Sequence, residues 1–124
     1  MLCVFVLRAW TTCQGFVGAN ELRAMKPSSV FISLGRGAVV DEAALANALA
    51  THAIKGAVLD VFAVEPLPQT SPLWDLDNVL LTAHNADLTA NYFELGWNVW
   101  AENLERFLEG DSSLATPVDV ANGY

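Results

Sequence analysis

Three polar residues of different chemistry each stand shortly after an apolar stretch of this chain: Arg36, Glu65 and His84. An arginine presents a planar fork of donors that matches a carboxylate in bidentate geometry. A histidine can accept or donate a proton near neutral pH, and a carboxylate that contacts the imidazole favours its charged form. Together they would supply an anion anchor, an acid/base group and an orienting carboxylate. This set suits the oxidation of a carbon that bears both a hydroxyl and a carboxylate.

The surroundings of these residues add to the pattern. Arg36 lies between Gly35 and Gly37, which let the backbone turn sharply and let a ligand approach closely. Asp60, in "VLDVF", is unusual because aspartate is depleted in strands. It could accept a hydrogen bond from a ligand amide, or simply bond a nearby backbone amide. Taken alone, each residue also has an ordinary explanation: a surface arginine at a turn, a solvated glutamate or a satisfied loop histidine.

Four short apolar stretches must position these side chains. They lie at residues 2–7, 30–34, 57–62 and 78–82. Apolar stretches that alternate with helical segments predict an α/β fold with a buried parallel sheet. Ligands bind outside the carboxyl ends of the strands in such sheets. We therefore expect the three polar residues to face one crevice.

Two helices are predicted between the strands. Asn20 is the expected N-cap of a brief helix that runs through Met25. Asp41 is the expected N-cap of a helix over residues 42–52, "EAALANALATH", which is rich in good helix formers.

A long amphipathic helix is predicted at about residues 89–109, with Thr89 as its N-cap and Gly110 as its stop. Its apolar face consists of Phe93, Trp97, Trp100, Leu104 and Phe107. The aromatic residues of this face are expected to pack in a core. Residues 111–124 are predicted to be a loop-like tail.

Composition narrows the classes of partner. Hydrophobic residues make up 53% of the chain, which supports a packed core, and the net charge is −8. An acidic chain argues against nucleic acid and anionic membrane surfaces, whereas small anions can still bind at a local cation. No apolar run reaches the roughly 18 residues that span a bilayer. Two cysteines without a paired motif indicate reduced thiols in a cytoplasmic protein.

Three segments resemble one known family. They are "MKPSSVFISLGRGAVVDEAALANAL", "GAVLDVFAVEPLP" and "SPLWDLDNVLLTAH". These blocks are similar, in the same order, to the C-terminal part of D-isomer-specific 2-hydroxyacid dehydrogenases, and the resemblance runs from about residue 14 to 110. It implies a partial Rossmann-type, doubly wound parallel sheet followed by a long helix. Residues 1–110 would then be the C-terminal portion of an NAD(P)-binding domain.

The resemblance also implies roles for the matching positions. Arg36 would bind the substrate carboxylate, Glu65 would hold the histidine, and His84 would exchange a proton with the substrate oxygen. Asp60 would bond the nicotinamide carboxamide. The expected cofactor-binding residues are Leu34, Gly35, Arg36, Asp60, His84, Asn85 and Ala86. The cofactor would be NAD or NADP, the substrate a small 2-keto or 2-hydroxy acid, and the full-length protein a homodimer; no metal site is expected.

The sequence departs from the family pattern in three ways. Ala83 stands where most members have a proline, and Asn85 stands where small or apolar residues are commoner. The Gly-rich GxGxxG turn, which cradles the cofactor pyrophosphate, does not occur in the chain. We therefore expect a truncated fragment with little activity alone. Two alternatives stay open: a non-catalytic interaction module with a dehydrogenase fold, and an unstable gene-model fragment.

Overall fold

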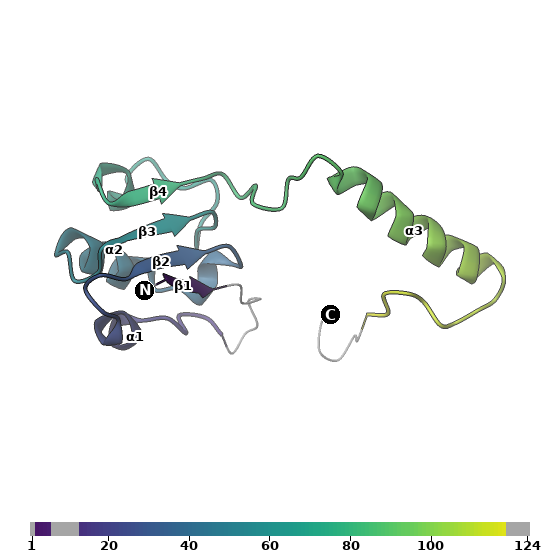
Figure 1. The fold of residues 1–124 in the computed structure, drawn as a ribbon, viewed down its shortest axis with the longest axis horizontal. Coiled ribbons are helices and arrows are strands. Elements are labelled where there is room, and N and C mark those ends of the chain that lie inside the picture. The colour runs from purple at the N-terminus through teal and green to yellow at the C-terminus, as the bar shows by residue number, and fades with distance from the viewer. Residues whose placement is uncertain (1, 6–12, 119–124) are drawn as a thin grey trace. The chain divides into compact units, whose positions relative to one another are not determined.

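The structure is a computed structural model that describes residues 2–5 and 13–118. Four strands form one parallel sheet in the order β1-β2-β3-β4 (Figure 1). Their bounds are Leu2–Phe5, Val30–Ser33, Gly56–Leu59 and Val79–Leu81. This confirms the predicted α/β fold. Residues 6 and 7 of the first predicted strand, the last six residues of the tail and the Cys3 side chain lie outside the described residues.

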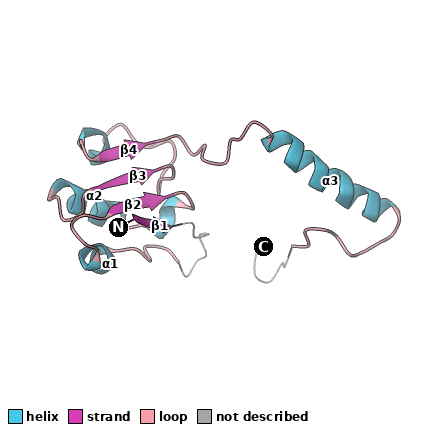
Figure 2. Ribbon diagram, in the orientation of Figure 1, coloured by secondary structure: helices cyan, strands magenta, loops and turns pink. Residues whose placement is uncertain are grey.

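The register brings the carboxyl ends of neighbouring strands together. Ser33 pairs with Leu59, and Leu59 pairs with Leu81. The arrowheads of β2, β3 and β4 point the same way in Figure 2, so the loops that follow these strands leave from one edge of the sheet. The third predicted strand is shorter than 57–62, because the ladder ends at Leu59 and Asp60 already lies in the following bend.

Two helices, α1 (Ala19–Ala24) and α2 (Glu42–Ala50), connect β1 to β2 and β2 to β3 and contact each other. The strands follow one another in a single direction, and right-handed crossovers of that kind place their helices on one face. The described sheet is therefore one half of a doubly wound arrangement. Its core includes Phe31, Leu49 and Ile54, each 0% exposed.

The helix starts test the predicted caps. Asp41 is the N-cap of α2, and its Oδ1 accepts a hydrogen bond from the Ala44 amide at 3.0 Å, as predicted. The predicted cap Asn20 is wrong, because α1 begins earlier, with Gly18 as its N-cap. The Glu21 carboxylate accepts from the Gly18 amide at 3.0 Å and fixes that start, while the Asn20 side chain accepts from Arg23.

The long helix is α3 (Tyr92–Leu108), and its predicted cap is also wrong. Asn91 is the N-cap residue, and Thr89 lies in the preceding turn, where its carbonyl accepts from the Tyr92 amide. Gly110 ends the helix as predicted, with a φ of +77° that suits glycine. None of the α3 side chains, all of them described, is buried. The expectation that they form a core is not met within this structure.

The chain divides into two compact units, residues 1–86 and 87–124. The helix α3 thus groups with the residues that follow it, and the assignment of residues 1–110 to one domain stays a prediction. Across the described ranges, no helix is both long and apolar enough to cross a membrane. Cys13 is a free thiol.

Candidate active site

The turn that carries Arg36 is fixed by close contact between backbones. After β2 the chain passes through Arg36 into a 3-10 helix, η1 (Gly37–Val39). A Cβ on Gly37 would lie 1.9 Å from the carbonyl carbon of Phe62, so only glycine fits there. The second glycine of "GRG" therefore lets the Arg36 turn pack directly on the loop that leads to Glu65.

The Arg36 side chain is exposed at this edge of the sheet. Its Nη1 donates to the Gly35 carbonyl at 2.9 Å, which anchors one end of the guanidinium. A guanidinium has five N–H donors, so this bond leaves donors that can meet a carboxylate in solution.

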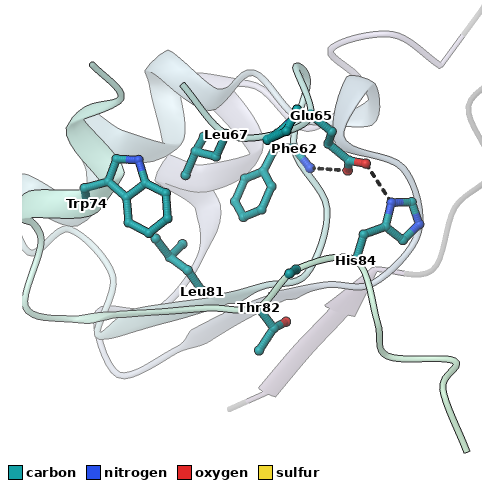
Figure 3. Close-up of a pocket in the computed structure, with 9 residues that line it drawn as sticks. Phe62, Glu65, Leu67, Trp74, Leu81, Thr82 and His84 are labelled. Carbon is teal, nitrogen blue, oxygen red and sulfur yellow. Dashed lines mark hydrogen bonds and ion pairs between the residues drawn. The ribbon is translucent and has the colours of Figure 1, made fainter. Parts of the chain in front are cut away.

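Glu65 and His84 form a pair between two neighbouring loops. His84 Nδ1 lies 2.7 Å from Glu65 Oε2, and Glu65 Oε1 accepts from the Phe62 amide at 2.9 Å (Figure 3). The hydrogen bond from His84, followed by the bond from Phe62, holds the pKa of Glu65 below its usual value; burial opposes this, and the charges of His84 and Arg36 add to it. The predicted orienting carboxylate is therefore in contact with the predicted acid/base group.

The pair fixes the role of each imidazole nitrogen. An ionised carboxylate only accepts hydrogen bonds, so Nδ1 of His84 carries the proton of this bond. Nε2 is then the nitrogen that can exchange a proton with a ligand. Both side chains are partly exposed, His84 by 41% and Glu65 by 36%, so a ligand from solvent can reach the pair.

Asp60 lies at the end of β3 and is 1% exposed. Its Oδ1 accepts from the Asn85 amide at 3.0 Å and from the Thr82 hydroxyl, and its Oδ2 accepts from the Ala86 amide at 2.9 Å. Burial raises the pKa of Asp60, but these three hydrogen bonds, together with the charge of His84, outweigh burial and the pKa lies below its usual value. The carboxylate thus bonds nearby backbone amides, and a bond to a nicotinamide carboxamide stays a prediction.

The remaining predicted cofactor residues border the same edge. Leu34 follows β2 and is 37% exposed, and Gly35 comes next in the chain. Asn85 and Ala86 follow His84 and are exposed. An exposed apolar side chain beside backbone and amide groups fits the nicotinamide end of a dinucleotide. Nothing in the sequence matches the Gly-rich turn that would hold the pyrophosphate.

Sequence reasoning missed two features of this region. An apolar cavity of about 590 Å³ lies beside the Glu65–His84 pair and is lined by Phe62, Leu67 and Trp74 among others (Figure 3). The Pro-rich segment "AVEPLPQTSPLWDLD", residues 63–77, predicts only an irregular loop. Its apolar residues were the one signal in the sequence that could have indicated this cavity. The role of Thr82 was also missed, because a partnership with Asp60 depends on strand register.

Within the described part of the chain, no group of three or more His, Cys, Asp or Glu residues could hold a metal ion.

Comparison with known proteins gives a consistent result. The family model of the D-isomer specific 2-hydroxyacid dehydrogenase NAD binding domain matches residues 3–86. The chain is 49% identical over 88 residues to glyoxylate/hydroxypyruvate reductase B of Pectobacterium carotovorum, covering 71% of this chain and 27% of that protein. It is 42% identical over 107 residues to D-3-phosphoglycerate dehydrogenase of Escherichia coli, covering 82% of this chain and 26% of that protein.

A solved structure extends the match to the fold. It is a D-isomer specific 2-hydroxyacid dehydrogenase from Xanthobacter autotrophicus, in complex with NADPH and MES, with a TM-score of 0.88 and 39% identity. The match covers 99% of this chain and 50% of that one. The chain thus spans half or less of these relatives. Because the family model covers most of its length, the chain belongs to the D-isomer specific 2-hydroxyacid dehydrogenase family.

Proposed function

We propose that this chain carries the substrate-anchoring and proton-transfer groups of an NAD(P)-dependent dehydrogenase that acts on the CH–OH group of small 2-hydroxy acids. The observation that carries the proposal is the 2.7 Å contact between His84 and Glu65 at the sheet edge where Arg36 is exposed. The family model that matches residues 3–86 is that of an NAD binding domain, which supports a nicotinamide cofactor. The choice between NAD and NADP stays open.

In the direction of keto-acid reduction, Arg36 binds the substrate carboxylate through its guanidinium and orients the neighbouring carbonyl. His84 donates the Nε2 proton to the carbonyl oxygen, which becomes the hydroxyl of the product. Glu65 keeps the imidazole oriented through its contact with Nδ1. A nicotinamide cofactor, when bound, would supply the hydride for the carbonyl carbon. In the reverse direction His84 accepts the hydroxyl proton.

We propose that Leu34, Gly35, Asn85 and Ala86, together with Arg36 and His84, would hold the nicotinamide. We further propose that the 124-residue chain turns over slowly by itself, because it has no GxGxxG turn to bind the pyrophosphate. Homodimer formation in the full-length protein is part of the same proposal.

The test transplants the site into an active background. The matching segment of the Pectobacterium carotovorum reductase is replaced by this chain's residues, and reduction of glyoxylate and hydroxypyruvate is followed with NADH and with NADPH. His84→Ala should lower kcat by about 10²- to 10⁴-fold, since it removes the acid/base group. Arg36→Ala should raise KM and lower kcat/KM.

The matched control is His52→Ala, which removes the other histidine, outside the site, and should leave the rate unchanged. A chimera that folds but loses no rate on His84→Ala would contradict the proposed mechanism. Steady consumption of NADH or NADPH by the 124-residue chain alone would contradict the proposal of slow turnover.

A further inference from the structure

His84 has an unusual backbone conformation. Its φ is +51°, in the left-handed region that residues other than glycine adopt uncommonly, histidine more often than most, and His52 lies there too, at +52°. Such a conformation persists only where the surroundings determine it. Some contact near His84 must therefore hold the turn in this shape.

The two amides after His84 provide that contact. Successive backbone N–H groups beside a left-handed residue form a concave site that binds an anion. Here the N–H groups belong to Asn85 and Ala86, and the anion is the carboxylate of Asp60, at 3.0 Å and 2.9 Å. The anion is thus a side chain of the neighbouring strand end.

Asp60 is itself fixed to the sheet. Its amide donates to the Ser33 carbonyl at 3.0 Å, which continues the ladder of β2 and β3. The Thr82 amide donates to Leu59 at 2.9 Å, and the Thr82 hydroxyl donates to the Asp60 carboxylate. Through its amide and its carboxylate, Asp60 thereby links the ends of β2, β3 and β4 to the turn that carries His84.

We propose that Asp60 is a positioning residue that sets the orientation of His84 through the Asn85 and Ala86 amides. A carboxylate has about four acceptor sites. Three hydrogen bonds within the chain already use Asp60, which is 1% exposed. These bonds fix the carboxylate within the protein and leave about one acceptor site free. The catalytic meaning of this role rests on the proposed function of His84.

The charged groups around His84 divide into two sets. Glu65 contacts the imidazole, and the positive charge of Arg36 acts on Glu65. Asp60 accepts from the backbone amides after His84 and has no hydrogen bond to the imidazole, although the charge of His84 also acts on it. Removing Asp60 should therefore disturb the Glu65–His84 contact indirectly, by releasing the turn.

The first experiment uses NMR on the 124-residue chain, whose two histidines, His52 and His84, make the ring signals simple to assign. In Asp60→Asn, the Nδ1 proton signal of His84 should be lost to solvent exchange. Exchange of the Asn85 or the Ala86 amide should quicken by about tenfold or more, because these two amides donate to different oxygens of Asp60 and the NH2 group that replaces one oxygen cannot accept. Thr82→Val is the matched control, since it removes the hydroxyl bond and keeps both amide bonds.

A folded Asp60→Asn variant with an unchanged His84 signal and unchanged amide exchange would overturn the proposal. If the variant does not fold, acid titration of the wild-type chain decides. The Asn85 and Ala86 amide shifts should then follow the titration of the Asp60 carboxyl, also in a Glu65→Gln background. Amide shifts that follow Glu65, or that do not move, would overturn the proposal.

These readouts need neither cofactor nor substrate, so they are independent of whether the proposed function is correct. In the active chimera, Asp60→Asn should lower kcat by about tenfold or more while KM for NADPH stays within about twofold. A raised KM for NADPH with unchanged kcat would indicate direct contact with the cofactor, and would also overturn the proposal.

Discussion

The turn that carries Arg36 and the turn that carries His84 lie at the same edge of the sheet but are held by different forces. Gly37, directly after Arg36, packs its backbone on that of Phe62. Amides of the segment that precedes α1 add backbone hydrogen bonds to this turn, such as the bond from Val17 N–H to the Val39 carbonyl at 3.0 Å. The turn of His84 is instead held by the buried carboxylate of Asp60.

Because different forces hold them, the two turns should respond to different perturbations. A contact between backbones depends on size and hardly on charge, because it excludes any side chain. A carboxylate that accepts from backbone amides depends on its ionisation and little on volume. The turn of Arg36 should therefore be sensitive to a larger side chain at Gly37, and the turn of His84 to protonation of Asp60.

The largest effect is expected at Gly37. Gly37→Ala would place a Cβ 1.9 Å from the Phe62 carbonyl carbon and 2.0 Å from its oxygen, and these are backbone atoms that cannot rotate away. We expect the free energy of unfolding to fall by about 3 kcal/mol or more, measured by urea denaturation.

Gly96→Ala is the matched control for this change. Gly96 lies inside α3 with nothing within 4 Å of a built Cβ. The substitution should stabilise the helix by about 1 kcal/mol, since alanine is the better helix former. Equal effects at the two glycines would refute the steric account of the Arg36 turn.

The second largest effect is expected at Asp60 and concerns the pH dependence of stability. The folded pKa of Asp60 lies below its ordinary value, so the unfolded chain binds the proton more tightly. Its contribution to stability is therefore complete above the ordinary value and is lost as the pH falls through the folded pKa. Near pH 7, Asp60→Asn should destabilise the fold by about 1–3 kcal/mol.

Thermal melts of wild type and Asp60→Asn from pH 7 to pH 3 measure this difference. The gap between the two melting temperatures should narrow as the pH falls below the ordinary pKa of aspartate. A gap that is constant over the whole range would mean that the charge of Asp60 does not hold the turn.

The smallest effect is expected at Asp41, which follows the Arg36 turn and caps α2. Asp41→Ala removes the acceptor of the Ala44 amide and should cost about 1 kcal/mol of stability. The keto-acid binding that we propose for Arg36 should be retained, because backbone contacts hold that turn. Loss of binding in calorimetry without unfolding would show that the helix start also supports Arg36.

The sequence predicted the fold well where periodicity and composition are strong. Four apolar stretches became the four parallel strands, and the position of Glu65 and His84 after two of them correctly suggested their contact. The helix starts at Asn20 and Thr89 were wrong, because a capping residue competes with its neighbours for the same amides. In α1, the side chain of Glu21 accepts from the Gly18 amide and thereby fixes the start of the helix.

The partners of Asp60 could not be read from the sequence. Aspartate at a strand end predicts an acceptor, but the donors lie 22 to 26 positions away and are mostly backbone groups that carry no sequence signal. The close packing at Gly37 is similar, because glycine indicates freedom or crowding without saying which backbone approaches. Contacts of this kind can be predicted only when the register of the sheet is known.

The exposure of the Glu65–His84 pair has a consequence for ionic strength. Both side chains are more than a third exposed, so dissolved ions can screen their attraction. Asp60 is 1% exposed, and its hydrogen bonds lie beyond the reach of such screening. Added sodium chloride should loosen the imidazole from Glu65 while the turn beneath it keeps its shape. Salt would then act on the ring of His84 and leave its backbone unchanged.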